Sequence, residues 1–413
     1  MKLLPRYPAF SRLWLAGAIS QVGDKFNDLA IPIFVYSLTD SAWHLGLVGF
    51  VASLAIFIFG LIAGVVSDRL PRRPLMISAD IVRLMVFLGL ALLAYSELPL
   101  NITLICLYVA AFISSAADQF AQPSRYALIT QMVDKDDLMQ ANALDHATTN
   151  IAAFIGFALA GITIEIVGVS MAFLLDALTF LISASLLLSI RHQEKIPENR
   201  KAFSFFQDLK EGLDYAWSKP VLKGTVIISL MVPAALGAML ALDIIFSHRV
   251  LLTGDRGFSI LRLIFAPALA LGFIYAGQRF KDMPRGILLS RTVLGVGLSR
   301  VGFYLTPLIL MAFGVREPWV LFGAASIFWL MTAFIHSGIF LSIRMVIQEA
   351  SESHFIGRST GIINVSASVA WSLGQLSAGL ADVMPVAVVL LFWSVFMVVL
   401  GIWAQRWKIF QSL

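Results

Sequence analysis

Charged residues are scarce in this sequence. Only 13% of its 413 residues are Asp, Glu, Lys or Arg, whereas 59% are hydrophobic. A soluble globular protein has roughly a quarter charged residues, so this composition excludes a soluble domain with one apolar core. Apolar runs of about 20 residues recur from end to end, and each is long enough to cross the hydrocarbon layer as a helix. Because the runs are continuous rather than alternating, they also exclude a membrane β-barrel.

Cysteine and catalytic motifs are equally rare. The single cysteine, Cys106, lies in an apolar run and supports neither a disulfide nor a metal site. The sequence has no phosphate loop of the Gly-x-x-x-x-Gly-Lys type and no paired His/Glu motif, which argues against an ATP-driven pump and a membrane metalloenzyme. We therefore expect neither an enzyme nor a bound cofactor or metal. The net charge of +5 does not indicate nucleic-acid binding, because in a membrane protein the positive charges mainly set orientation.

The apolar runs predict an all-α polytopic membrane protein with twelve transmembrane helices. We expect them at 10–37, 44–66, 75–95, 102–130, 137–165, 170–190, 221–248, 258–279, 286–312, 318–348, 356–383 and 386–406. This divides the chain into an N-terminal six-helix half (1–190), a cytoplasmic linker (191–220) and a C-terminal six-helix half (221–413). In the linker, Phe206, Leu209, Leu213 and Trp217 share one face at helical spacing. They predict an amphipathic helix that lies on the inner membrane surface, docked on membrane lipids or on protein.

The placement of Lys and Arg predicts the orientation of the chain. With the N-terminus in the cytoplasm, only three of the 30 Lys and Arg residues lie in outer segments, at Arg249, Arg256 and Arg316. Seven lie within helices, which leaves 20 in cytoplasmic segments, as the positive-inside rule requires. We expect a multi-pass protein of the inner (cytoplasmic) cell membrane, with both termini in the cytoplasm and acting as a monomer.

The two halves contain a repeated segment. The sequences AGVVSDRLPRR (63–73) and AGQRFKDMPRG (276–286) share Ala, Gly, Pro and Arg at identical spacing. A repeat that follows the second helix of each half predicts two pseudo-symmetric halves, as in transporters built from parallel repeats.

The first copy of the repeat resembles the loop signature Gly-x-x-x-Asp-Arg-x-Gly-Arg-Arg of the major facilitator superfamily, with Pro71 in place of the second Gly. The resemblance implies a conformational latch. In it, Asp68 would accept hydrogen bonds from a neighbouring helix end as the halves rock, and Arg72 and Arg73 would lie at the lipid headgroups. The matching residues are Gly64, Asp68, Arg69, Arg72 and Arg73.

Other segments resemble the drug:proton antiporter-3 branch of that superfamily, which includes macrolide and enterobactin exporters. This resemblance implies a secondary transporter that exports an amphipathic drug- or siderophore-like molecule in exchange for protons by alternating access. Bacterial lysophospholipid transporters have a similar pattern, so a lipid-flipping facilitator is the alternative, and a non-transporting membrane sensor is a remote one. The fifth-helix motif reads GFALAG at 156–161, without the usual Pro. The resembling segments are 23–32, 122–125, 140–144, 173–180, 208–213 and 357–382.

Ionisable side chains within the spans are costly and are therefore candidates for function. Asp24 and Asp28 lie one turn apart near mid-depth of the first helix, where they could bind protons or cargo. Lys25 could instead pair permanently with Asp28. On the fourth helix, Asp118 and Arg125 are seven residues apart on one face, so Arg125 would either hold anionic cargo or pair with Asp118.

The fifth helix adds two further candidates, Asp145 and His146. His146 titrates near neutrality, but it could also be a hydrogen-bonded fixture near the inner surface. Asp80 and Arg83 are expected to form an intrahelical pair. The sequence alone does not rank Asp176 or Asp243, because the rotation of their helices is unknown. We predict a proton- and substrate-coupling site drawn from Asp24, Asp28, Asp118, Arg125, Asp145 and His146.

Overall fold

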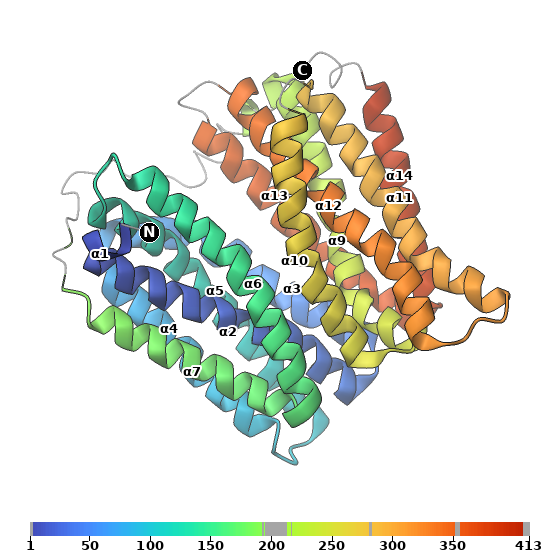
Figure 1. Ribbon diagram of the computed structural model, residues 1–413, viewed down its shortest axis with the longest axis horizontal. Helices are drawn as coiled ribbons and strands as arrows, with labels where there is room; N and C mark the ends of the chain where they lie inside the picture. The colour runs from blue at the N-terminus through green and yellow to red at the C-terminus, as the bar shows by residue number, and fades with distance from the viewer. Residues whose placement is uncertain are drawn as a thin grey trace. The chain divides into compact units, whose positions relative to one another are not determined.

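The computed structural model describes residues 3–191, 194, 213–215, 217–280, 283–351 and 356–407. Within these ranges the regular structure is helical (Figure 1). The chain forms two compact units. Unit 1 comprises Met1–Thr39 and Val51–Phe203, and unit 2 comprises Asp40–Phe50 and Ser204–Leu413. Most of the expected linker helix lies outside the described residues.

Twelve helices of at least 20 residues occur in the described ranges. The first half has α2 (Pro8–Thr39), α3 (Ala42–Arg69), α4 (Arg72–Leu93), α5 (Leu100–Met132), α6 (Leu138–Val167) and α7 (Val169–Leu188), after the short α1 (Leu3–Arg6). The second half has α9 (Pro220–Arg249), α10 (Gly254–Arg279), α11 (Arg285–Ala312), α12 (Pro318–Ala350), α13 (Ile356–Ser377) and α14 (Val386–Arg406). A short 3-10 helix, η1 (Ala378–Asp382), follows α13, so the α-helix there ends six residues before the predicted 383.

Ten of the described helices are long and apolar enough to cross a membrane. The two long helices outside this group are α2 and α13. Helix α2 contains Arg12, Asp24, Lys25 and Asp28, and α13 is rich in Ser and Gly. Polar groups on spanning helices are tolerated where they face the interior of a bundle, so both helices can still cross the bilayer. The predicted polytopic all-α fold is confirmed.

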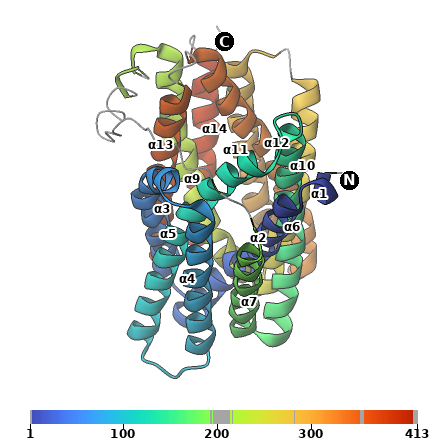
Figure 2. The same cartoon turned by 90° about the vertical axis from the view of Figure 1, so that its left-hand side faces the viewer.

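In unit 1, α7 packs against both α2 and α4, and α4 packs against α5. Figure 2 shows α4 and α5 running antiparallel, joined by a short connection at its lower edge. The core between α4 and α7 contains Phe87, which stacks on Phe180 with ring centroids 5.8 Å apart and on Phe173 at 6.4 Å. These rings fix α7 against α4 and so determine which residues α7 presents to α2.

In unit 2, the start of α3 is capped from another part of the chain. Asp382 accepts hydrogen bonds from the backbone N–H groups of Ala42 (2.7 Å) and Trp43 (3.0 Å) and from Ser41 Oγ (2.7 Å). The first N–H groups of a helix have no intrahelical partner and favour an anion. Partial burial alone would raise the pKa of Asp382, but these hydrogen bonds hold it below its ordinary value.

Candidate functional site

Unit 1 contains a cavity of about 380 Å³ that is lined mainly by polar and charged residues. It lies among α2, α4, α5 and α6, with Ile56 of α3 at one side. Its charged lining residues are Asp24, Lys25, Asp28, Arg83 and Asp118, and its uncharged polar ones are Gln21, Asn27, Ser114, Ser115, Gln119, Gln122, Thr149 and Asn150. Charged groups at this depth of a membrane protein are expected at a substrate or ion site.

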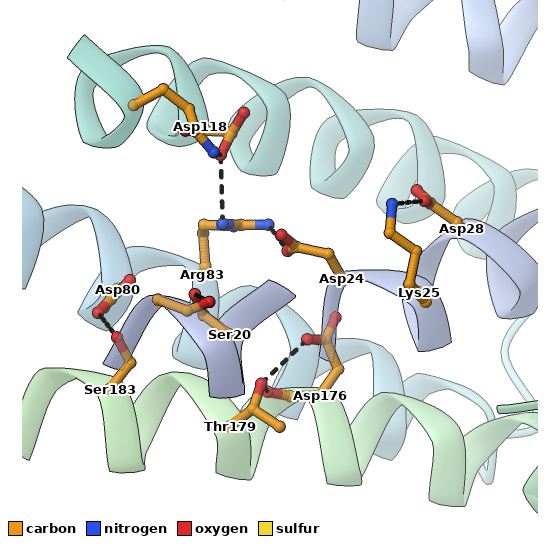
Figure 3. A network of polar contacts seen from close by, with 12 residues as sticks. Ser20, Asp24, Lys25, Asp28, Asp80, Arg83, Asp118, Asp176, Thr179 and Ser183 are labelled. Carbon is orange, nitrogen blue, oxygen red and sulfur yellow. Dashed lines mark hydrogen bonds and ion pairs between the residues drawn. The ribbon is translucent and has the colours of Figure 1, made fainter. Parts of the chain in front are cut away.

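Arg83 is the centre of the charged network. From α4, its guanidinium pairs with Asp24 of α2, and its Nη1 lies 3.5 Å from Asp118 Oδ1 of α5 (Figure 3). It also lies 4.1 Å from the ring centre of Phe180 on α7. The Arg83 side chain is 7% exposed, whereas those of Asp24 and Asp118 are 22% and 31% exposed. One buried cation thus joins two carboxylates from different helices at the cavity wall.

Lys25 and Asp28 form the ion pair that their spacing allowed, with 2.6 Å between Lys25 Nζ and Asp28 Oδ2. Lys25 Nζ also lies 5.5 Å from the ring centre of Phe157 on α6. Gly156 makes room for this arrangement, because a Cβ at that position would lie 2.7 Å from Lys25 Cβ. Asp28 is therefore matched by a cation on its own helix.

Asp176, which the sequence did not rank, lies next to this network. It comes from α7, is 0% exposed, and its Oδ1 accepts a hydrogen bond from Thr179 Oγ1 at 3.4 Å. Its Oδ2 has no hydrogen-bond partner among the described residues. Gly23 of α2 faces it, since a Cβ there would lie 2.6 Å from Asp176 Oδ1. The available sequence signal was a single acid within the otherwise uncharged run 169–188.

Asp80 does not pair with Arg83, contrary to the expectation of an intrahelical pair. Its Oδ2 accepts a hydrogen bond from Ser183 Oγ of α7 at 2.6 Å. A spacing of three residues on a helix allows an ion pair but does not require one. Arg83 instead turns towards the carboxylates of α2 and α5, which the tertiary packing brings to it.

Arg125 pairs with Asp145 of α6 and not with Asp118. Seven residues of helix span about 10 Å along the axis, which is too far for direct contact. Arg125 and Asp145 are both buried, and Gly17 of α2 provides the space for the guanidinium. His146 is exposed, with its ring centroid 6.4 Å from that of Tyr126.

Of the six predicted coupling residues, the structure places Asp24, Asp28 and Asp118 on the cavity wall. It places Arg125 and Asp145 in a separate buried pair and His146 on the surface.

The arginines of the predicted latch bind backbone carbonyls. Arg73 donates to the carbonyls of Leu187 and Leu188 at the end of α7, both at 2.7 Å, and the buried Arg72 donates to that of Ser67 at 3.2 Å. The last carbonyls of a helix attract cations, which accounts for these contacts. That the two arginines lie at the lipid headgroups stays a prediction. Arg69 is exposed at the end of α3.

The surroundings of Gly64 and the side chain of Asp68 lie outside the described part of the structure, so the Asp68 latch stays a prediction. Glu194 accepts hydrogen bonds from the backbone N–H groups of Arg72 (2.5 Å) and Arg73 (2.8 Å) and so caps α4.

Unit 2 contains a second Asp–Arg pair, on helices that have the same places in the chain order as α2 and α4. Asp243 lies on α9 and Arg300 on α11, the first and third long helices of the second half, as α2 and α4 are of the first. Arg300 Nη1 lies 3.2 Å from both carboxylate oxygens, and the Tyr304 hydroxyl donates to Asp243 Oδ1 at 2.8 Å. The side chains of Asp243 and Arg300 are 0% and 4% exposed. The Asp243–Arg300 pair is therefore buried from solvent, whereas the Asp24–Arg83 pair borders a cavity.

The described residues contain no group of three His, Cys, Asp or Glu side chains that could hold a metal ion. The polytopic helical fold and a polar, charged cavity within it define a membrane transport protein rather than an enzyme.

Comparison with known proteins identifies the family. The sequence matches the Major Facilitator Superfamily over residues 13–375, and the chain belongs to that family of transporters. It is 23% identical over 321 residues to the enterobactin exporter EntS of Escherichia coli O1:K1 / APEC, covering 78% of this chain and 73% of that protein. The identity, length and coverage are the same for EntS of Shigella boydii serotype 18.

Solved structures share the fold at low sequence identity. The nucleoside transporter NupG has a TM-score of 0.75 and 13% identity, with 98% of this chain and 99% of that chain covered. A bacterial homologue of the iron transporter ferroportin, in an inward-facing state, has a TM-score of 0.75 and 14% identity, with 97% and 99% covered. The predicted superfamily and its fold are thereby confirmed.

Proposed function

We propose that this protein is a proton-coupled exporter of an amphipathic small molecule of the drug or siderophore kind, which works by alternating access. The observation that supports it most directly is Arg83, one buried cation shared by Asp24 and Asp118 at the wall of a polar cavity. When two carboxylates share one guanidinium, the carboxylate that loses this cation can bind a proton instead. The similarity to enterobactin exporters supports the direction and the class of cargo.

The proposed coupling residue is Asp24. Asp28 already has a cation of its own, Lys25, on the same helix. Asp24 depends on Arg83, which it shares. If cargo or a structural change draws Arg83 towards Asp118, Asp24 loses its cation in a poorly solvated place and binds a proton. Cargo occupancy and proton occupancy would thereby be linked.

Transport in proteoliposomes tests this proposal. The purified protein is reconstituted with an internal pH-sensitive dye, and enterobactin is supplied under an imposed pH gradient. We expect enterobactin movement that the gradient drives and that is accompanied by proton flux. Asp24→Asn should abolish the gradient-driven part while sparing exchange of enterobactin at equal pH. The matched control is Asp255→Asn, which removes a carboxylate from an exposed pair with His248 in unit 2 and should change neither activity.

A lipid-flipping facilitator is the second candidate, and one observation favours it. Unit 1 has an apolar cavity of about 330 Å³ beside α3, α4 and α5, lined by Phe59, Phe112, Phe120 and other apolar side chains, which suits an acyl chain. The same assay with a lysophospholipid and with a macrolide separates the candidates. Movement of the lysophospholipid alone, independent of pH, would overturn the exporter proposal in favour of the facilitator.

We further propose that the protein lies in the inner membrane with both termini in the cytoplasm. The support is the distribution of Lys and Arg, with 20 in the segments assigned to the cytoplasm and three in the outer ones among 30 in total.

A further inference from the structure

We infer that Asp176 is a proton-binding site: it holds a proton in this conformation and exchanges it with Asp24 across the gap left by Gly23. The inference deepens the proposed proton coupling and rests on it for its role in transport. Its first element, a neutral Asp176, follows from the local structure alone.

Burial without a cation partner is the first argument. The Asp176 side chain is completely buried, and its Oδ2 has no hydrogen-bond partner among the described residues. An ionised carboxylate needs several donors or a cation when it is removed from water, and an isolated one is strongly disfavoured. A neutral carboxylic acid requires fewer hydrogen-bond donors and no cation, so the surroundings of Asp176 suit the neutral form.

The balance of charge around Asp176 is the second argument. The network in Figure 3 contains five carboxyl groups, at Asp24, Asp28, Asp80, Asp118 and Asp176, and two cations, at Lys25 and Arg83. The two cations pair with Asp24, Asp28 and Asp118, which leaves Asp80 and Asp176 without a salt bridge in the described structure. Like charges in a low-dielectric region cannot all be ionised, and Asp176 is the more deeply buried of the two.

The charged groups that act electrostatically on Asp176 come from helices that pack against α7. Helix α2 contributes Asp24 and Asp28, and α4 contributes Arg83. The two acids disfavour ionisation of Asp176, while Arg83 is engaged with Asp24 and Asp118. Movement of Arg83 towards α7 would therefore stabilise the ionised form of Asp176.

Gly23 gives Asp176 access to the α2 side. Any side chain at this position would meet Asp176 Oδ1 at 2.6 Å, so glycine leaves the carboxyl group against the α2 backbone, one residue from Asp24. The exchange is a simple transfer. The proton leaves Asp176, which becomes a carboxylate, and joins Asp24, which becomes a carboxylic acid, so the total charge is unchanged. Asp24 borders the cavity, from which the proton can reach water.

Infrared difference spectroscopy of the reconstituted protein tests the inference without any cargo. A neutral buried carboxylic acid gives a C=O stretching band separate from that of carboxylates. We expect such a band at neutral pH in the wild type, its loss in Asp176→Asn, and its persistence in Asp28→Asn, the matched control. Because Asn resembles a neutral acid in shape, Asp176→Asn should keep the wild-type melting temperature.

Two outcomes would overturn the inference. The first is an Asp176→Asn spectrum with the same carboxylic-acid band as the wild type. The second applies if that variant does not fold, and it uses Asp176→Glu, which keeps the acid but moves it. This variant should shift the carboxylic-acid band, and an unshifted band would show that the proton is bound at another residue. If the band behaves as expected but enterobactin transport ignores the pH gradient, the proton site stands and the proposed coupling fails.

Discussion

Replacing Asp145 with Asn leaves Arg125 charged and buried without its carboxylate partner. The two side chains are 6% and 4% exposed, so water can offer little compensation. Removing one member of a buried pair costs about 3–5 kcal/mol, which lowers the ratio of folded to unfolded protein by roughly two to four orders of magnitude. We expect Asp145→Asn to lower the free energy of unfolding by that amount, measured by denaturant unfolding of the purified protein in detergent micelles.

The Lys25–Asp28 pair provides a matched control with the same chemical change. Its side chains are 26% and 47% exposed, so Asp28→Asn should lower the free energy of unfolding by at most about 1 kcal/mol. A combined Arg125→Met and Asp145→Leu variant should recover most of the stability lost in Asp145→Asn, because no charge is then left unpaired. Equal small losses in Asp145→Asn and Asp28→Asn, or no recovery in the double variant, would refute the reasoning.

Three further predictions concern single residues. Asp382→Ala removes the cap of α3 and should lower the free energy of unfolding by about 1 kcal/mol at neutral pH. Because the pKa of Asp382 is lowered in the folded protein, this stabilisation is present above about pH 4 and is lost at more acidic pH. The melting temperatures of wild type and variant should therefore converge in acid. Asp68→Asn should impair transport with folding largely intact, and normal turnover of the purified variant would contradict the latch. A cysteine introduced at Ser204 in a Cys106→Ser background should resist an impermeant thiol reagent on intact cells, whereas strong labelling from outside would reverse the proposed orientation.

Much of the fold could be predicted because the bilayer leaves few choices. The predicted spans begin and end within four residues of the observed helices, apart from the end of the 356–383 span. Hydrocarbon thickness sets the length of each apolar run, and backbone groups in lipid must be satisfied within a helix. The repeated segments at 63–73 and 276–286 predict two related halves from sequence spacing alone, and this stays a prediction.

The partners of the charged residues could not be predicted in the same way. Sequence spacing suggested Asp118 for Arg125 and Asp80 for Arg83, but the structure gives Arg125 to Asp145 and Arg83 to Asp24 and Asp118. The local pair Lys25–Asp28, three residues apart on one helix, was within reach of the sequence. Pairs between helices depend on rotation and axial shift, which side-chain packing decides.

The sequence by itself thus determined a membrane protein of twelve helices, its superfamily and a set of costly charges within the spans, because composition, periodicity and motif spacing are local properties. Only the tertiary structure decided that Arg83 pairs with carboxylates from two helices at a cavity, and that the pair of Asp243 and Arg300 in unit 2 is buried. It also identified Asp176 as a candidate proton site through its surroundings. These are a glycine on α2 and a threonine on its own helix, with no cation in contact among the described residues. Burial and pairing arise from the packing of helices that are distant in the chain, and so the sequence alone could not assign them.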